Sequence, residues 1–226
     1  MRSKVLLRGL FFSGLCAFML GLTQPAQAIV ILSNLPGAGS PGTSLGVGID
    51  GRVRLKAVGL TVGANDLSFT SMSGLFRNPN NVPRSVNGGI FSDVGGDPGV
   101  QLVAFNPVPI AAGAFDMLQT LTAVSAFTLM ANTSYWFVLG GPAVENEMSW
   151  SGLAPDTAPT PSGEVFSFDG YNFSITGGAT WVDTGVIFNS VEIEASLITD
   201  LPEPGTLAVF ALGLLGLGVA CRRQRA

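Results

Sequence analysis

The stretch Arg52-Val53-Arg54-Leu55-Lys56-Ala57-Val58 alternates charged and apolar side chains, the pattern of a β-strand with one solvent face and one buried face. Between the two ends of the chain, no long segment shows the 3.6-residue period of a helix. Short runs with a period of two recur instead, bounded by Gly and Pro. We therefore predict an all-β fold, a β-sandwich or jelly roll of about ten short antiparallel strands.

The predicted strands share this alternation or an apolar run between turn residues. They cover residues 29–32, 52–58, 67–76, 99–105, 117–121, 127–130, 135–139, 165–168, 171–175 and 186–195. Asp169-Gly170 predicts a two-residue hairpin turn between the eighth and the ninth of them. Residues 95–98 predict a turn, and residues 154–163, with three prolines, predict a loop.

The first 28 residues have the three parts of a secretory signal peptide. Arg2, Lys4 and Arg8 form a positive segment, and residues 10–22 form a short apolar helix. Ala26-Gln27-Ala28 follows as a small-x-small cleavage site, with Ala26 and Ala28 fitting the pockets of signal peptidase. We predict that the exported protein begins at Ile29.

The last 26 residues combine a rigid triplet, an apolar helix and a basic cluster. Pro202-Glu203-Pro204 is an extended, non-helical segment, because proline cannot continue a helix. Residues 205–221 carry no charge and would span about 25 Å as a helix, enough to cross a thin bilayer. Arg222, Arg223 and Arg225 resist translocation and should stay in the cytoplasm. Hydropathy alone also fits a plain membrane anchor.

The order of Pro202-Glu203-Pro204, apolar helix and arginine cluster resembles the PEP-CTERM sorting signal of exported bacterial proteins. The resemblance covers residues 201–226, with Gly205 where Ser is usual. It implies an exosortase that recognises the triplet and removes the helix. The protein would be held in the inner membrane until processing and would then lie at the cell surface or outside the cell.

The exported domain, residues 29–200, is acidic and contains neither cysteine nor histidine. It has five basic and 14 acidic side chains, a net charge of −9. This charge argues against nucleic acid and against anionic lipid as partners. Without disulfides, the stability of the domain must come from its core.

Two patches of this domain resemble the choice-of-anchor β-sandwich domains of exported bacterial proteins. One is Asp93-Val94-Gly95-Gly96-Asp97-Pro98-Gly99 with the strand that follows, and the other is residues 127–129 running into residues 131–136. This resemblance implies a fold and a location and no chemistry.

Catalytic signals are weak in the exported domain. The absence of histidine excludes Ser-His-Asp and Cys-His catalysis and most zinc chemistry, and no cofactor is expected. The pairs Glu145/Glu147 and Glu192/Glu194 would each share one strand face, which is more typical of a solvated surface than of a glycosidase dyad. We expect no enzyme, with a secreted glycosidase as a distant alternative.

Charged residues offer two ligand hypotheses. Arg52, Arg54 and Lys56 could bind an acidic polysaccharide, although the solvent face of a strand explains them as well. Asp93 and Asp97 could bind calcium from a Gly-rich turn, but two carboxylates need backbone carbonyls to complete the shell. A plain turn also accounts for them.

The tryptophans offer a third hypothesis. In the strand 135–139, Trp136 should face opposite to Tyr135 and Phe137 and pack in an apolar layer. Trp150 and Trp181 lie beside Ser- and Gly-rich segments, where an exposed ring could stack on sugars. We expect an exported surface or matrix protein with a structural or adhesive role; the alternative is a carbohydrate-binding module.

Overall fold

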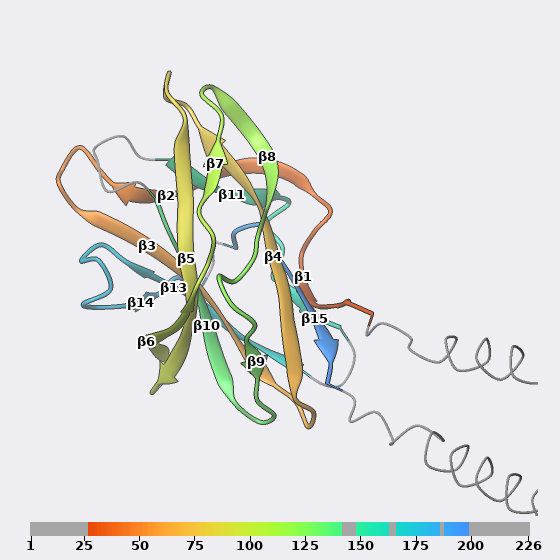
Figure 1. The fold of residues 1–226 in the computed structure, drawn as a ribbon. Helices are drawn as coiled ribbons and strands as arrows, with labels where there is room; N and C mark the ends of the chain where they lie inside the picture. The colour runs from red at the N-terminus through yellow and green to blue at the C-terminus, as the bar shows by residue number, and fades with distance from the viewer. Residues whose placement is uncertain (1–26, 142–147, 163–165, 186–187, 199–226) are drawn as a thin grey trace, which may run out of the picture.

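The computed structural model describes residues 27–141, 148–162, 166–185 and 188–198. They form an all-β domain in which every pairing between named strands is antiparallel (Figure 1). The strands are β1 (Ile29–Ser33), β2 (Ala38–Val47), β3 (Val53–Val62), β4 (Leu67–Asn78), β5 (Arg84–Val94), β6 (Asp97–Ala104), β7 (Val108–Ile110), β8 (Ala114–Leu121), β9 (Thr128–Leu129), β10 (Ser134–Gly140), β11 (Met148–Ala154), β12 (Thr160–Pro161), β13 (Phe166–Ser174), β14 (Val182–Asp183) and β15 (Glu192–Leu197). Among these residues, no helix is long and apolar enough to cross a membrane.

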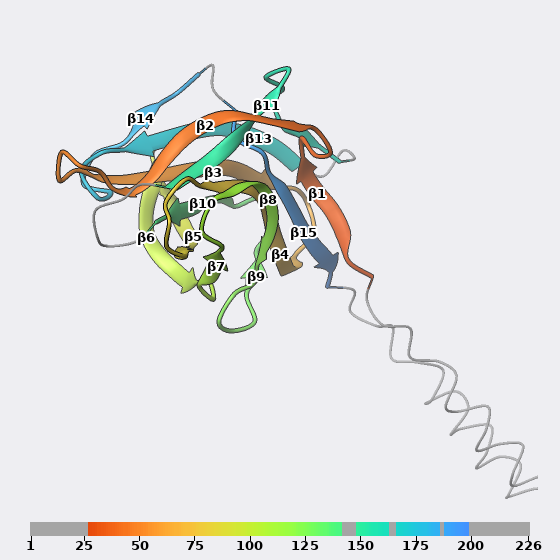
Figure 2. The ribbon, with the colours of Figure 1, turned by 90° about the horizontal axis from the view of Figure 1, so that it is seen from above.

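The strands follow one continuous hydrogen-bonded path, β12-β1-β15-β4-β11-β2-β3-β10-β5-β6. One section runs from β12 to β2, with β8 and β9 also paired to β4. The other runs from β3 to β6, and β13 pairs with β3. Among the described residues, β2 and β3 connect the two sections through the pairs Gly46↔Arg54 and Val47↔Val53. The path therefore turns there, and the two sections curve around a common interior (Figure 2).

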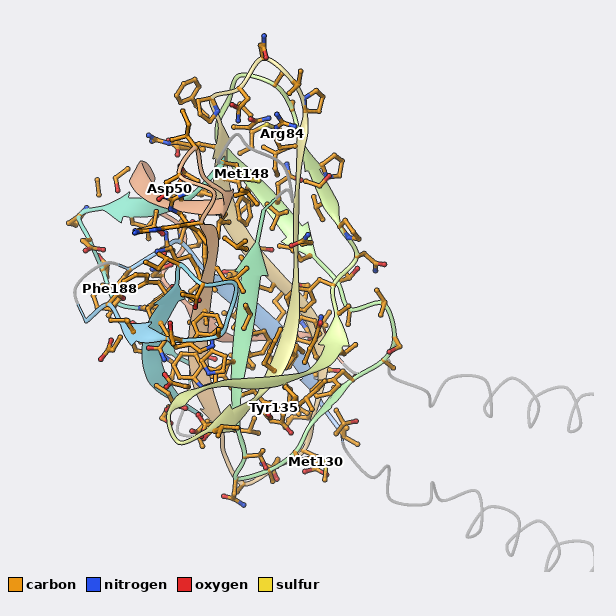
Figure 3. All side chains as sticks on the ribbon, turned by 90° about the vertical axis from the view of Figure 1, so that its left-hand side faces the viewer. Asp50, Arg84, Met130, Tyr135, Met148 and Phe188 are labelled. Atoms are coloured by element: carbon orange, nitrogen blue, oxygen red, sulfur yellow. The ribbon has the colours of Figure 1, made fainter. Side chains whose placement is uncertain are left out.

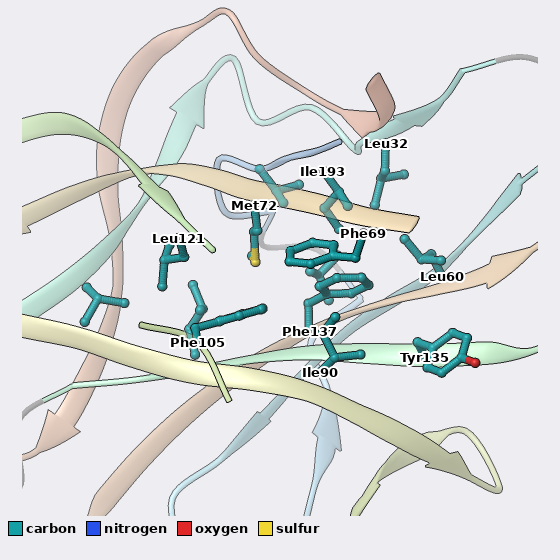
Figure 4. Packing of buried hydrophobic residues seen from close by; sticks show 14 of the residues in the cluster. Leu32, Leu60, Phe69, Met72, Ile90, Phe105, Leu121, Tyr135, Phe137 and Ile193 are labelled. Atoms are coloured by element: carbon teal, nitrogen blue, oxygen red, sulfur yellow. The ribbon is translucent and has the colours of Figure 1, made fainter. Parts of the chain in front are cut away.

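The main core lies between these two sections. Phe69, Met72 and Ile193 point inward from β4 and β15, toward Ile90 and Phe137 of β5 and β10 (Figure 4). The ring of Phe69 lies 5.7 Å from that of Phe137. Burying such aromatic and aliphatic side chains supplies the main driving force for folding in a domain without disulfides.

A smaller apolar cluster covers the opposite face of β3 and β10. Trp136, Val138 and Ala57 are buried there, and Trp181 packs against them. Tyr135 and Phe137 lie in the main core, so the predicted orientation of Trp136 relative to its two neighbours is confirmed. Both faces of this part of the sheet are therefore covered.

Several predicted strands are confirmed with small shifts in their ends, namely those that correspond to β1, β3, β4, β6, β8, β9 and β10. The turn predicted at residues 95–98 is confirmed at Gly95 and Gly96, which lie between the paired residues Val94 and Asp97, whereas Asp97 and Pro98 already belong to β6. β2, β5, β7, β11, β12 and β14 have no predicted counterpart, so the described residues form 15 strands where about ten were predicted. The predicted strand 186–195 is too long, since β15 begins only at Glu192.

The predicted hairpin at Asp169-Gly170 is wrong. β13 passes through both residues and pairs with β3 on either side of them, from Phe166↔Val62 to Ser174↔Leu55. The register shifts between Phe168 and Gly170, so Asp169 is the extra residue of a β-bulge. Gly170 has φ 111°, a conformation that favours glycine in a bulge as well as in a turn.

Candidate functional site

The residues predicted to direct sorting lie at the edge of the described structure or beyond it. Ala26, the triplet Pro202-Glu203-Pro204 and the arginines Arg222, Arg223 and Arg225 lie outside the described residues. Ala28 is exposed and immediately precedes β1. The signal-peptidase site and the recognition triplet therefore stay predictions, and the structure describes the domain surface from which both segments leave.

Both segments leave from neighbouring positions. Ile29 at the start of β1 pairs with Ala195 of β15. Leu197 pairs with Leu67 on β4, and the backbone N–H of Ile198 donates to the carbonyl of Asp66 at 3.2 Å. The first residue after the predicted signal peptide and the last described residues before the triplet therefore lie at one end of the domain (Figures 1 and 2).

The basic alternation at the start of β3 does not present one charged face to solvent. Lys56 lies opposite Leu139, which belongs to the main core, and its Nζ sits 4.6 Å from the ring centre of Phe173. Burial and, to a smaller extent, the positive charge of Arg54 together lower the pKa of Lys56 to about 8. The prediction that Lys56 lies on a solvent face is therefore wrong, because the face of β3 that carries Lys56 continues into the main core.

The arginines beside it are engaged with one carboxylate. Arg54 Nη2 lies 2.9 Å from Asp50 Oδ2, and Arg52 Nε lies 3.6 Å from the same atom. The pKa of Asp50 is lowered, first by the hydrogen bond from the Arg52 backbone N–H. An acidic polysaccharide would have to compete with Asp50 for these two side chains.

The two aspartates proposed for calcium face structural donors. Trp136 Nε1 donates to Asp93 Oδ1 at 2.8 Å, and Asn172 Nδ2 donates to Asp97 Oδ1 at 2.7 Å. Asn172 Nδ2 also reaches the carbonyl of Gly96 at 3.1 Å. These bonds fasten the β5–β6 turn across the outer face of β10 and β3. Among the described residues, no group of three or more His, Cys, Asp and Glu side chains could hold a metal ion.

Trp150 cannot stack on a ligand, contrary to the sequence hypothesis. Its side chain is fully buried, and its Nε1 donates to the carbonyl of Ser190 at 2.6 Å. The indole packs between the rings of Phe76 and Tyr171. A Ser-rich neighbourhood suggested exposure, but Ser151 beside it is itself buried and donates to the carboxylate of Asp116. Trp181 is half-buried beside the outer cluster and keeps part of its surface exposed.

The carboxylates of Glu192 and Glu194 do not converge on a shared site. Glu192 accepts a hydrogen bond from Ser33 on β1, and Glu194 accepts one from Ser71 on β4. The two side chains thus serve different neighbouring strands. Glu145 and Glu147 lie outside the described residues.

An ion pair between β4 and β8 was not predicted from the sequence. Arg77 donates to both carboxylate oxygens of Asp116 at 2.6 and 2.7 Å, and Ser151 donates to one of them at 2.8 Å. Asp116 has φ 51°, a left-handed conformation that aspartate tolerates better than most residues. The pKa of Asp116 is lowered, first by the hydrogen bond from Arg77. Its carboxylate joins β8 to β4 and β11, and no local pattern in the sequence indicates this.

A buried polar residue, Asn189, was also missed. Its Nδ2 donates to the carbonyl of Trp150 at 2.6 Å, and its own carbonyl accepts from the hydroxyl of Tyr171 at 2.6 Å. Burial raises the pKa of Tyr171 well above its ordinary value. The sequence signal was the pair Asn189-Ser190, which interrupts the apolar alternation of residues 186–195.

The comparisons with known proteins concern the C-terminal segment alone. A family model of the PEP-CTERM protein-sorting motif matches residues 200–224. The motif implies an exported protein that is sorted by an exosortase and associated with the membrane or the cell surface. No curated protein and no solved structure matches the chain.

Proposed function

We propose that this protein is an exported component of the cell surface or extracellular matrix, with a structural or adhesive role in an exopolysaccharide or biofilm matrix. The observation that carries the proposal is the PEP-CTERM match at residues 200–224. In this account the helix 205–221 anchors the protein in the inner membrane, and exosortase acts at Pro202-Glu203-Pro204.

The arrangement of the chain ends supports such processing. β15 ends at Leu197, before the sorting motif begins at residue 200. Removing the helix 205–221 would therefore take no described strand from the sheet. The folded domain would keep its core and its hydrogen bonds after release, as a sorted surface protein requires.

A non-catalytic role is part of the proposal. The exported domain has no histidine, and its one lysine, Lys56, is half-buried with its ammonium group over an aromatic ring. The carboxylates of Asp93, Asp97, Glu192 and Glu194 accept hydrogen bonds from structural donors. Catalysis needs converging groups with free access to a substrate, and these side chains do not converge.

We further propose that the domain is a β-sandwich of the choice-of-anchor type. The support is the pair of facing strand sections and the two patches that resemble this family. In the first patch, Asp93 and Asp97 fasten the β5–β6 turn to Trp136 and Asn172. This contact gives a structural reason for both aspartates to occur in the turn.

Carbohydrate binding is the second candidate, and Trp181 favours it. Of the two tryptophans proposed for stacking, Trp150 is buried and Trp181 keeps part of its surface exposed. Binding would be tested with matrix polysaccharide by affinity electrophoresis of Trp181→Ala, with Val182→Ala, an exposed neighbour, as control. Retardation that is lost only in Trp181→Ala would support the candidate, and equal mobility of all forms would exclude it.

The leading proposal is tested by replacing Glu203. Glu203→Ala leaves the apolar length and the terminal charges unchanged, so the variant should insert normally but remain membrane-bound and unprocessed in a host with exosortase. The control, Leu212→Ile, preserves the helix and should be processed like the parent. Size and membrane fractionation of the three proteins would be compared. Release of Glu203→Ala at the parental rate would mean that the triplet is not the recognition element.

A further inference from the structure

Four large apolar side chains are exposed at the end of the domain where the chain enters and leaves. They are Ile29, Met130, Leu197 and Ile198, with exposed fractions of 41 %, 50 %, 41 % and 45 %. We call them the apolar pole. Scattered exposed apolar residues are ordinary, but four that gather beside both chain ends define a surface with a specific orientation.

The fold gathers these residues through adjacent strands. Leu197 pairs with Leu67 on β4, and on the other side of β4 Leu67 pairs with Leu129, the residue before Met130. Ile29 lies beside this group because β1 pairs with β15. The apolar pole is thus a property of the strand register.

Asp66 fixes the positions of Met130 and Ile198. Its carbonyl accepts from the Ile198 N–H at 3.2 Å, and its Oδ1 accepts from the Ala131 N–H at 2.7 Å. The N–H of Met130 donates to the hydroxyl of Tyr135 at 3.1 Å. Met130 and Tyr135 lie at one end of the molecule and Asp50 toward the other (Figure 3).

The pole offers apolar contact without positive charge. β1, β9, β15 and the turns at residues 63–66 and 130–133 contain neither Lys nor Arg. Electrostatic attraction to anionic headgroups is therefore not available, and contact with lipid would rest on shallow insertion of apolar side chains.

The length of the connecting chain decides what faces this surface. Six residues lie between Ile198 and Gly205, where the predicted helix enters the membrane, and the seven residue-to-residue steps extend over at most about 25 Å. We propose that, before processing, the apolar pole lies against the outer leaflet of the membrane that holds the C-terminal helix. This inference rests on the proposed function. A short tether gives a high effective concentration, so contact that is weak in free solution suffices.

The contact would hold Pro202-Glu203-Pro204 at the membrane surface, between the domain and the helix. A membrane-embedded exosortase would then meet the triplet at a fixed height. Substitutions in the pole should change the exposure of this segment without changing the recognition residues themselves.

The test uses the full chain, expressed without exosortase and reconstituted into vesicles of phosphatidylcholine and phosphatidylglycerol. In a Cys16→Ser, Cys221→Ser background, Met130→Cys carries a fluorophore, and nitroxide-labelled lipids act as quenchers. The matched control is Leu118→Cys on β8, since Leu118 is 57 % exposed. A remote control is Ile49→Cys in the β2–β3 turn. We expect at least threefold stronger quenching at residue 130 than at either control.

Equal quenching at the three positions would overturn the inference. A second variant, Ile198→Ser with the label at residue 130, should show weaker quenching. Unchanged quenching in this variant would also contradict the inference. Stronger quenching at residue 130 than at the controls that occurs only after exosortase is added would show that the apolar pole contacts the enzyme and not the lipid. Failure of the labelled protein to float with the vesicles would instead contradict the membrane anchor, and with it the proposed function.

Discussion

Lys56 makes the stability of the fold depend on pH. Its ammonium group lies over the ring of Phe173, half-buried, and burial lowers its pKa to about 8 from 10.5. Below pH 8 the amine holds its proton in the folded and the unfolded chain alike. Between pH 8 and 10.5 the unfolded chain binds more protons, so the free energy of unfolding rises with pH through this window.

The corresponding prediction concerns Lys56→Met. The parent domain should gain stability between pH 7.5 and 9.5, and the variant should lack this gain and be the more stable protein at pH 7. Urea unfolding midpoints at both pH values would measure the difference. The range stops below pH 10, because ionisation of Tyr171 in the unfolded chain would then destabilise the fold. Parallel pH dependences in parent and variant would contradict the burial of this charge.

Asp116 is the second residue with a measurable role. Asp116→Ala should lower the free energy of unfolding by about 2 kcal/mol, because Arg77 and Ser151 lose a charged acceptor. Asp116→Asn should lose less, since asparagine tolerates the left-handed conformation. The surface control is Asp50→Ala, whose exposed ion pairs should matter far less. Similar losses in Asp116→Ala and Asp50→Ala, measured by urea unfolding, would argue against this role.

At the scale of strands, local alternation predicted only part of the sheet. β3 begins with a clear alternation of charged and apolar residues, and β10 is a continuous apolar run, so both were predicted. β2 and β5 are rich in Gly and Ser, which have little intrinsic strand propensity, and pairing with distant strands stabilises them. Asp169-Gly170 fits a turn locally, but β3 offers a partner on both sides and makes it a bulge. The burial of Trp150 likewise depends on β4 and on Ser190, far away in sequence.

Two glycines test this strand arrangement. A Cβ at Gly88 would overlap the carbonyl oxygen of Val138 on β10, so Gly88→Ala must displace backbone. At Gly170 a Cβ would meet open space, and only the positive φ opposes substitution. We expect Gly170→Ala to cost about 1–2 kcal/mol of unfolding free energy and Gly88→Ala clearly more. Thermal unfolding would rank them, and the reverse order would contradict the pairing of β5 with β10.

At the scale of the whole molecule, the fold brings the first and the last described strands together. β1 and β15 are neighbours, so the predicted signal peptide and the segment that matches the sorting motif adjoin the same end of the domain. The sorting function itself could be predicted from the sequence, because it depends on a short linear order of residues and not on tertiary contacts. The ligand hypotheses could not be decided in this way, since exposure and competing hydrogen bonds depend on the fold.

The central claim is that this domain is exported and then cut free from its membrane helix. Intact-mass analysis of the protein recovered outside a host with exosortase tests both ends at once. The account predicts the mass of a chain that begins at Ile29 and lacks the helix 205–221. A recovered protein that still extends to Ala226 would show that the C-terminal segment is only an anchor and would contradict the account.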